Sequence, residues 1–231
     1  MKSELLDRLL EALAAKRPTV VATRLPEGDQ ALLFPLDDDA APDEWPSDEA
    51  RRALLEDRSL TIPTEAGSIF LRPYNPPVRL IVVGAVHITA PLARMAATAG
   101  IDVLVVDPRT AFASTERFPG MELVHSWPAE ALAELRPDHR TAVVTLTHDA
   151  KLDDPALVTA LETPAFYVGA LGSSRTHAKR LARLREEGVS EENIARIRAP
   201  IGLDIGARTP AEIAVAILAE LVAHLRTPAA E

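Results

Sequence analysis

The chain has 231 residues, of which 47% are hydrophobic and 26% charged, and its formal net charge is −9. This composition is typical of a globular protein of one or two domains, and the negative charge argues against nucleic acid as a general partner. The absence of cysteine excludes disulfides, thiolate metal sites and a catalytic thiol. No apolar run approaches the length of a membrane span, and the N-terminus lacks the apolar core of a signal peptide. We therefore expect a cytoplasmic protein without membrane contact.

Residues 1–72 predict a small α+β domain. An amphipathic helix opens the chain, and we expect hairpins over residues 19–34 and 59–71 because Gly- and Pro-containing turns join short apolar runs there. A helix over residues 48–56 lies between the hairpins, after a solvated acidic loop at 37–46. The proline-rich segment 73–77 predicts a linker. The opening helix carries its leucines on one face, at Leu5, Leu6, Leu9, Leu10 and Leu13.

Residues 78–109 predict a β–α–β unit, with which a larger domain over 78–231 begins. A short β-branched run, Leu80–Val83, indicates a buried strand and ends at Gly84. Helical spacing from Leu92 to Ala99 follows, and Gly100 ends the helix. A second apolar run, Ile101–Val106, indicates a parallel strand, and Asp107 comes directly after it. An acidic residue at that place binds a ribose hydroxyl in dinucleotide-binding Rossmann folds.

The turn after the first strand departs from the dinucleotide fingerprint G-x-G-x-x-G. It reads Gly84-Ala85-Val86-His87-Ile88-Thr89, so only the first glycine is present. A β-branched Val86 should stand where a pyrophosphate would lie. The motif therefore supports a Rossmann-like fold and weakens NAD(P) binding.

The rest of the chain alternates strands and helices. We expect strands at 121–125, 141–147 and 165–169, with helices at 128–135, 155–161, 175–187 and 210–225. This alternation predicts a doubly wound, mostly parallel α/β sheet. Ligands bind at the carboxyl ends of such strands, so we expect the loops at 84–87, 147–149 and 169–175 to meet there.

Two glycine-bearing loops are further candidates for ligand binding. Gly172 and Ser173 precede a long helix with Arg175 in its first turn, a pattern that suits an anion, although an isolated pattern of this kind more commonly only turns the chain and caps the helix. The second loop, residues 199–208, holds Gly202, Asp204 and Gly206 among apolar residues. Apolar residues in a loop indicate that it is packed down, which would hold Asp204 in place for either anchoring or ligand binding.

Residues 78–225 resemble the XdhC/CoxI family, the accessory proteins of molybdenum hydroxylases such as xanthine dehydrogenase. Several separate motifs carry the resemblance, in matching order and spacing. They are Gly84-Ala85 with His87; Val106-Asp107-Pro108-Arg109; Glu116-Arg117-Phe118-Pro119; Thr147-His148-Asp149; the segment Tyr167 to Ser173; Arg175-Thr176-His177; and the segment Pro200 to Ala214. Val86 replaces the family's glycine, and the N-terminal region lacks the GGG segment and cysteine of longer members.

The resemblance implies a chaperone without turnover that binds molybdenum cofactor, supports its sulfuration and passes it to the apo-hydroxylase. The implied partners are that hydroxylase and a cysteine desulfurase, and the N-terminal helix could also support a homodimer. The residues expected to bind the cofactor are Gly84, Ala85, His87, Asp107, Arg109, His148, Asp149, Gly172, Ser173, Arg175, Gly202, Asp204 and Gly206.

Two other functions stay open at this point. An NAD(P)-dependent oxidoreductase would use Asp107 for the ribose and His87 or His148 as proton donor, although Val86 and the lack of a Tyr-x-x-x-Lys pair count against it. A metal site from His87, His148, Asp149 and His177 is the least favoured, because nothing has the close helical spacing of known metal motifs.

Overall fold

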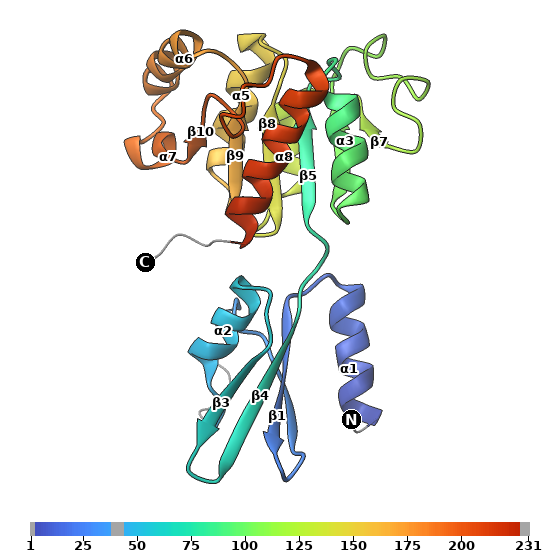
Figure 1. The fold of residues 1–231 in the computed structure, drawn as a ribbon, viewed down its shortest axis with the longest axis vertical. Coiled ribbons are helices and arrows are strands. Elements are labelled where there is room, and N and C mark those ends of the chain that lie inside the picture. The colour runs from blue at the N-terminus through green and yellow to red at the C-terminus, as the bar shows by residue number, and fades with distance from the viewer. Residues whose placement is uncertain (1–2, 38–43, 227–231) are drawn as a thin grey trace. The chain divides into compact units, whose positions relative to one another are not determined.

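The computed structural model describes residues 3–37 and 44–226, and within them the chain divides into two compact units after Pro76 (Figure 1). Most of the predicted acidic loop at 37–46 and the last residues of the predicted larger domain, 227–231, lie outside the described residues. The described part of the chain contains no helix long and apolar enough to cross a membrane.

The N-terminal unit is an antiparallel sheet with one helix on each face. Its strands are β1 (Thr19–Leu25), β2 (Gln30–Leu33), β3 (Leu60–Thr64) and β4 (Gly67–Tyr74), in the order β2-β1-β4-β3. Alternate residues of β1 point to opposite faces: Val20 and Ala22 pack with α2 (Ser47–Leu55), and Val21 packs with Leu9 of α1 (Ser3–Ala14). The predicted α+β fold of this region is confirmed.

Two details of this unit differ from the sequence prediction. Strand β4 continues to Tyr74, through Pro73 of the expected linker. Pro73 pairs with Val20 of β1 on one side, but β3 pairs with β4 only as far as Leu71, so the other side of Pro73 has no strand partner and a missing N–H is tolerated there. In α1, three of the predicted leucines, Leu6, Leu10 and Leu13, are exposed.

The second unit, residues 77–226, is built on a six-stranded parallel sheet. The strands are β5 (Arg79–Val83), β6 (Asp102–Val106), β7 (Glu122–Val124), β8 (Thr141–Thr145), β9 (Tyr167–Ala170) and β10 (Ile197–Arg198), in the order β10-β9-β8-β5-β6-β7. Numbered within the unit, this is the 3-2-1-4-5-6 order of a Rossmann fold. The order reverses between β5 and β8, and these two strands mark the switch point where ligands bind.

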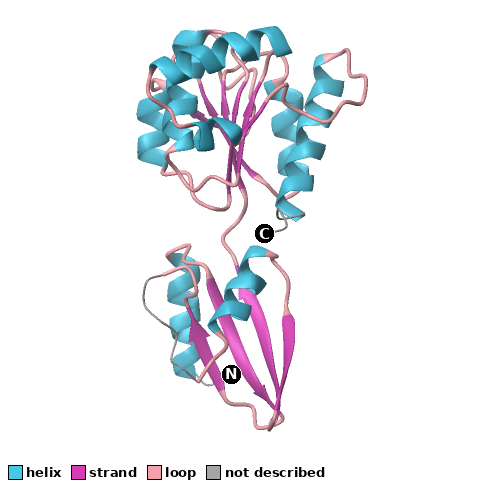
Figure 2. Cartoon of the chain, turned by 90° about the vertical axis from the view of Figure 1, so that its left-hand side faces the viewer, coloured by secondary structure: helices cyan, strands magenta, loops and turns pink. Residues whose placement is uncertain are grey.

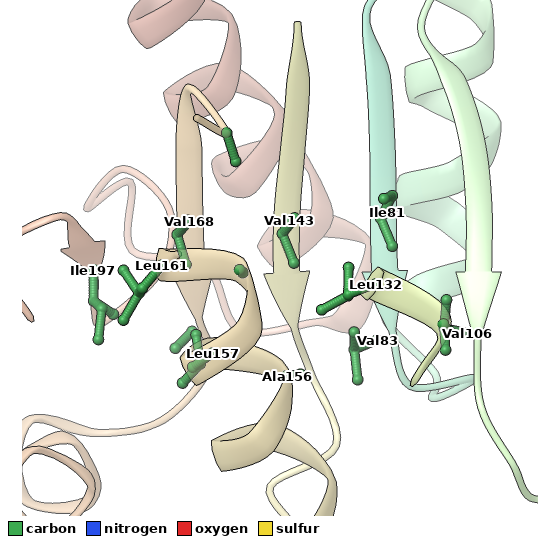
Figure 3. Packing of buried hydrophobic residues seen from close by; sticks show 14 of the residues in the cluster. Ile81, Val83, Val106, Leu132, Val143, Ala156, Leu157, Leu161, Val168 and Ile197 are labelled. Carbon is green, nitrogen blue, oxygen red and sulfur yellow. The ribbon is translucent and has the colours of Figure 1, made fainter. Parts of the chain in front are cut away.

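Helices cover both faces of this sheet (Figure 2). Leu80 and Val82 of β5 belong to the apolar cluster with α3 (Thr89–Thr98) and α8 (Pro210–Arg226). Ile81 and Val83 point to the opposite face, where Figure 3 shows them with residues of other strands and helices. The helices that contribute to that second cluster are α4 (Pro128–Leu135), α5 (Ala150–Leu161), α6 (Ser174–Glu186) and α7 (Glu191–Ala195). The predicted doubly wound fold is confirmed.

Two elements of this unit were wrongly placed by sequence reasoning. Strand β10 was missed because it has only two residues, which leave no pattern. Helix α5 begins at Ala150, five residues before the predicted start at Pro155. The buried residues Leu152, Ala156, Leu157, Ala160 and Leu161 keep helical spacing across the proline, and this stripe fixes the helix despite one missing backbone donor.

Candidate functional site

The candidate site lies at the carboxyl edge of the parallel sheet, where the loops after β5 and β8 diverge to opposite faces. Gly84 ends β5 with φ +111°, and a Cβ built on it would lie 2.5 Å from Cγ2 of Thr147 in the loop after β8. Only glycine therefore permits this approach. Two of the three predicted loops are thus in direct contact at the switch point.

The turn after β5 is closed by its own side chain. Thr89 is fully buried, and its Oγ1 donates to the carbonyl of Gly84 at 2.5 Å and accepts from the N–H of Val86 at 3.3 Å. In a dinucleotide site, backbone amides of this turn face the pyrophosphate. In this chain one such amide, the N–H of Val86, is already hydrogen-bonded to the hydroxyl of Thr89. The residue at the third glycine position therefore closes the turn from within.

The side chain of Val86 is half-buried and packs against the apolar cluster that includes Leu92 and Ile217. The β-branched side chain therefore contributes to the core, and internal hydrogen bonding also closes the turn. His87, the next residue, is exposed.

Asp107 forms the centre of a buried hydrogen-bond cluster. Its Oδ2 accepts from the N–H of Ala85 at 2.8 Å and from Nη2 of Arg109 at 2.8 Å. Its Oδ1 accepts from Nε of Arg109 at 2.9 Å and from the backbone N–H of Arg109 at 3.0 Å. Burial alone would raise the pKa of Asp107, but these hydrogen bonds outweigh burial and hold the pKa below its ordinary value.

This arrangement leaves Asp107 no free oxygen for a ribose. Both carboxylate oxygens are engaged, and Arg109 stacks on Phe112, with its guanidinium carbon 4.6 Å from the ring centroid. Asp107, Ala85 and Arg109, all expected to bind the cofactor, lie close together, but they hydrogen-bond to one another. The exposed member of this group is Arg109, whose side chain keeps 36% of its surface accessible.

The loop after β8 is held from beneath by Asp153 of α5. Oδ1 of this buried carboxylate accepts from Oγ1 of Thr147 at 2.6 Å, and Oδ2 accepts from the N–H of His148 at 3.1 Å. His148 has φ +63°, and its side chain is exposed at the edge. Asp149 caps α5 by accepting from the N–H of Lys151 at 3.0 Å. The structure thus gives Asp149 a capping role, while His148 faces solvent.

A buried charge cluster next to this loop was missed by sequence reasoning. Arg180 of α6, only 2% exposed, lies 3.5 Å from Asp153 and 3.7 Å from Asp154, and it donates to the carbonyl of Leu171 at 3.1 Å. Burial raises the pKa of Asp153. Arg183 pairs with Asp154 through both carboxylate oxygens.

One signal in the sequence could have revealed this cluster. His177, Arg180, Leu181 and Leu184 are spaced i, i+3, i+4, i+7, which places Arg180 on the buried stripe of its helix. Burial and the nearby Arg180 lower the pKa of His177. Within residues 3–37 and 44–226, no group of three His, Asp or Glu side chains is arranged to hold a metal ion.

The loop after β9 leads into α6. Gly172 has φ +142°, and Ser173 caps the helix by accepting from the N–H of Thr176 at 3.2 Å. Arg175 is exposed and faces a cavity of about 280 Å³. This cavity, which we call the α5–α6 pocket, is lined by His148, Ala150, Arg175, Thr176, Lys179, Arg180 and Arg183. The structure therefore joins the second and third predicted loops in one pocket.

The loop after β10 is anchored at both ends. At the near end the N–H of Gly202 donates to Oε2 of Glu220 at 2.8 Å, and the hydroxyl of Tyr167 donates to the same oxygen at 2.5 Å. At the far end Oε2 of Glu212 accepts from the N–H of Arg208 at 2.7 Å. Between these ends the expectation of a packed loop is wrong, because Leu203 and Ile205 are 45% and 52% exposed. Asp204 and Gly206 are exposed as well, so nothing in the described structure fixes the carboxylate of Asp204.

Strand order and edge geometry define a Rossmann-type unit whose turn after β5 is closed by internal hydrogen bonds. A family model described as the XdhC Rossmann domain matches residues 80–221. The chain therefore belongs to the XdhC family.

Named relatives support this assignment. The chain is 36% identical over 148 residues to a molybdenum cofactor insertion chaperone, PaoD, of Escherichia coli; the match covers 64% of this chain and 40% of that protein. It is 31% identical over 186 residues to a protein of Bacillus subtilis named as a probable xanthine dehydrogenase component, covering 77% of this chain and 53% of that protein. A protein of Escherichia coli called YqeB, uncharacterized, is 37% identical over 161 residues, covering 68% of this chain and 29% of the relative. This chain thus spans at most about half the length of these relatives.

Among solved structures, a xanthine dehydrogenase of Bacillus halodurans matches with a TM-score of 0.70 and 26% identity. The match covers 99% of this chain and 66% of that one.

Proposed function

We propose that this protein is a maturation factor for a molybdenum hydroxylase, which binds molybdenum cofactor at the carboxyl edge of its parallel sheet and delivers it to the apo-enzyme. Membership of the XdhC family carries the proposal, together with the 36% identity to a relative named as an insertion chaperone for this cofactor. The cofactor is cargo in this proposal, and the cytoplasm is where the transfer takes place.

The geometry of the turn after β5 disfavours the alternative, an NAD(P)-dependent oxidoreductase. A dinucleotide needs a free carboxylate for its ribose and free amides for its pyrophosphate. In this chain Asp107 is bonded to Ala85 and Arg109, and the N–H of Val86 is bonded to Thr89. Binding NAD(P) in the usual way would require these internal bonds to break.

Exposed donors around the switch point suit a polar cargo instead. His87, His148 and Arg175 follow three different strands of the sheet, and all three side chains are exposed. An imidazole or guanidinium donates hydrogen bonds to carbonyl and phosphate groups, which a pterin cofactor carries. Asp149, Ser173 and Gly202 support this edge through capping and anchoring bonds.

The test is binding and transfer of the cofactor by the purified protein. We expect saturable binding of molybdenum cofactor, followed by activation of a molybdenum-free hydroxylase, and no binding of NAD(P)H in a parallel titration. His87→Ala and His148→Ala should weaken cofactor binding. His125→Ala is the matched control, because His125 also follows a strand of the sheet, at the outer strand β7. Binding of NAD(P)H alone would refute the proposal in favour of the oxidoreductase.

Two further partners belong to this proposal. A cysteine desulfurase would supply sulfur to the bound cofactor, and a pull-down with the purified desulfurase would test that contact. A homodimer through α1 is also predicted, and the exposed Leu6, Leu10 and Leu13 are consistent with it. Sedimentation of the wild type and of Leu10→Glu would show whether α1 joins two copies.

A further inference from the structure

The α5–α6 pocket has a strongly basic wall. Arg175, Lys179, Arg180 and Arg183 all come from α6 and line it together with His148. Asp153 and Asp154 lie against this wall, and Arg183 pairs with Asp154. Asp149 lies between the lining residues His148 and Ala150 and caps α5, while Glu186 and Glu187 act on Arg183 at the other end of α6. Arg175 and Lys179 have no carboxylate partner among the described residues.

Arg180 is an unusual residue in this wall. It is 2% exposed, and its Nε and Nη1 make no hydrogen bond within the described structure. Buried charged donors are normally paired because desolvation is costly. Nη2 lies 3.5 Å from Asp153 and Nε lies 3.7 Å from Asp154, both at ion-pair distance. For Nη1 the described residues supply no hydrogen-bond acceptor. A buried guanidinium whose Nη1 lacks an acceptor, in the wall of a pocket, indicates a place for a ligand oxygen.

Two more features point to the same kind of ligand. The pocket runs along α6 from the first turn, at Arg175 and Thr176, to Arg183, and the positive end of the helix dipole favours an anion near that first turn. Arg175 and Lys179 form no hydrogen bond or ion pair with any described residue and line the pocket. Gly172 lies beside two residues of this wall: a Cβ built on it would lie 3.2 Å from Thr176 and 3.9 Å from Nη1 of Arg180.

We infer that the α5–α6 pocket is a phosphate site, which takes a phosphate monoester or diphosphate group. At about 280 Å³ it falls just below the size of pockets that hold a whole drug-sized ligand, so it fits one end of a larger molecule. Arg180 supplies the fixed planar fork, and Arg175 and Lys179 supply mobile charge at the entrance. That this group is the phosphate end of the cargo rests on the proposed function; the phosphate site itself rests on the pocket alone.

The experiment is calorimetric titration of the full chain with inorganic pyrophosphate, at fixed pH and near-physiological salt. We expect saturable binding at one site. Arg175→Ala and Lys179→Ala should each weaken it about tenfold, the usual weight of one charge-assisted hydrogen bond. Arg185→Ala is the matched control, since Arg185 lies on the same helix but pairs with Glu191 away from the pocket, and its affinity should stay within about twofold.

A second variant tests the contribution of the buried guanidinium group of Arg180. Arg180→Lys keeps the charge next to Asp153 and removes the planar donor geometry, so pyrophosphate affinity should fall about tenfold while circular dichroism shows a folded chain. Competition by a nucleoside monophosphate and by a nucleoside diphosphate then distinguishes the monoester from the diphosphate form. No binding to the wild type, or equal binding by all variants, would overturn the site.

Titration of the same purified proteins with pyrophosphate and with molybdenum cofactor tests the phosphate site and the proposed function separately. If the chain binds the cofactor but not pyrophosphate, the phosphate site is overturned and the maturation role stands. If it binds pyrophosphate but not the cofactor, the phosphate site stands and the maturation role is overturned.

Discussion

Replacement of Asp107 by asparagine should destabilise the Rossmann unit without changing its shape. Asparagine has nearly the same size, but its NH₂ group would face the donors of Arg109 or of the Ala85 amide, and the charge that draws Arg109 inward would be lost. Breaking a buried pair typically costs about 3–5 kcal/mol. Because the Arg109 side chain is 36% exposed, it can turn to water, and we expect a smaller cost of about 2–3 kcal/mol.

The loss can be measured by urea unfolding. Trp45 belongs to the N-terminal unit and Trp127 to the Rossmann unit, so Trp127 fluorescence in a Trp45→Phe background reports the second unit by itself. At this size a cost of about 2–3 kcal/mol corresponds to a thermal midpoint lower by roughly 5–10 °C. Asp102→Asn is the control, since Asp102 is exposed at the start of β6, the strand that Asp107 follows.

The effect should depend on pH in a defined direction. Hydrogen bonding lowers the pKa of Asp107 in the folded state below its ordinary value of 3.8. Its contribution to stability is therefore complete above that value and is lost as the pH falls through the folded pKa. The difference in unfolding free energy between wild type and Asp107→Asn should have the same size at about pH 7 as at about pH 5, and it should become smaller below about pH 4. An unchanged urea midpoint at neutral pH, or a difference that persists undiminished at about pH 3, would refute this account of the cluster.

Three further predictions concern Gly84, Thr89 and Tyr167 of the same unit. Gly84→Ala should lower the free energy of unfolding by about 3 kcal/mol or more, because the new Cβ would meet the facing loop and φ is positive at this position. Gly100→Ala is the control and should cost about 1–2 kcal/mol, because φ is positive there as well but the space around it is open. Equal losses for the two variants would contradict the close approach of Gly84 to the loop after β8. Thr89→Val should lower the free energy of unfolding by about 1–3 kcal/mol, and Thr89→Ser should lower it much less, since serine keeps the hydroxyl. The denaturation midpoints of the two variants measure this difference, and equal midpoints would contradict the role of the hydroxyl. Burial and the hydrogen bond to Glu220 raise the pKa of Tyr167, so its phenolate absorbance, isolated by comparison with Tyr167→Phe, should appear only when alkali unfolds the unit. A signal that precedes the loss of circular dichroism would contradict this.

The fold of this chain could be predicted largely from residue patterns. Strands buried on both faces, such as Leu80–Val83, show as continuous apolar runs, and the helices between them show their own period. Short or interrupted elements could not be recognised in this way. β10 is a two-residue strand, and Pro155 masked the first turns of α5.

The candidate site was harder to predict, because its geometry depends on contacts between distant segments. The loops after β5 and β8 were expected to meet, and the contact of Gly84 with Thr147 brings them together. Hydrogen-bond partners left no such trace: nothing in the sequence shows that Asp107 is bonded to Arg109 and Ala85. The apolar residues around Asp204 misled the prediction, since Leu203 and Ile205 are exposed.

The turn closed by Thr89 affects how proteins of this architecture can be found from their sequences. Since Thr89 and Asp107 already bond the amides of Val86 and Ala85, the second and third glycines of the nucleotide fingerprint are not needed, and substitution there does not break the fold. A search that requires those glycines would pass over chains built like this one. The more informative pattern is a strand-ending glycine, a threonine five residues later, and an Asp-x-Arg sequence after the next strand.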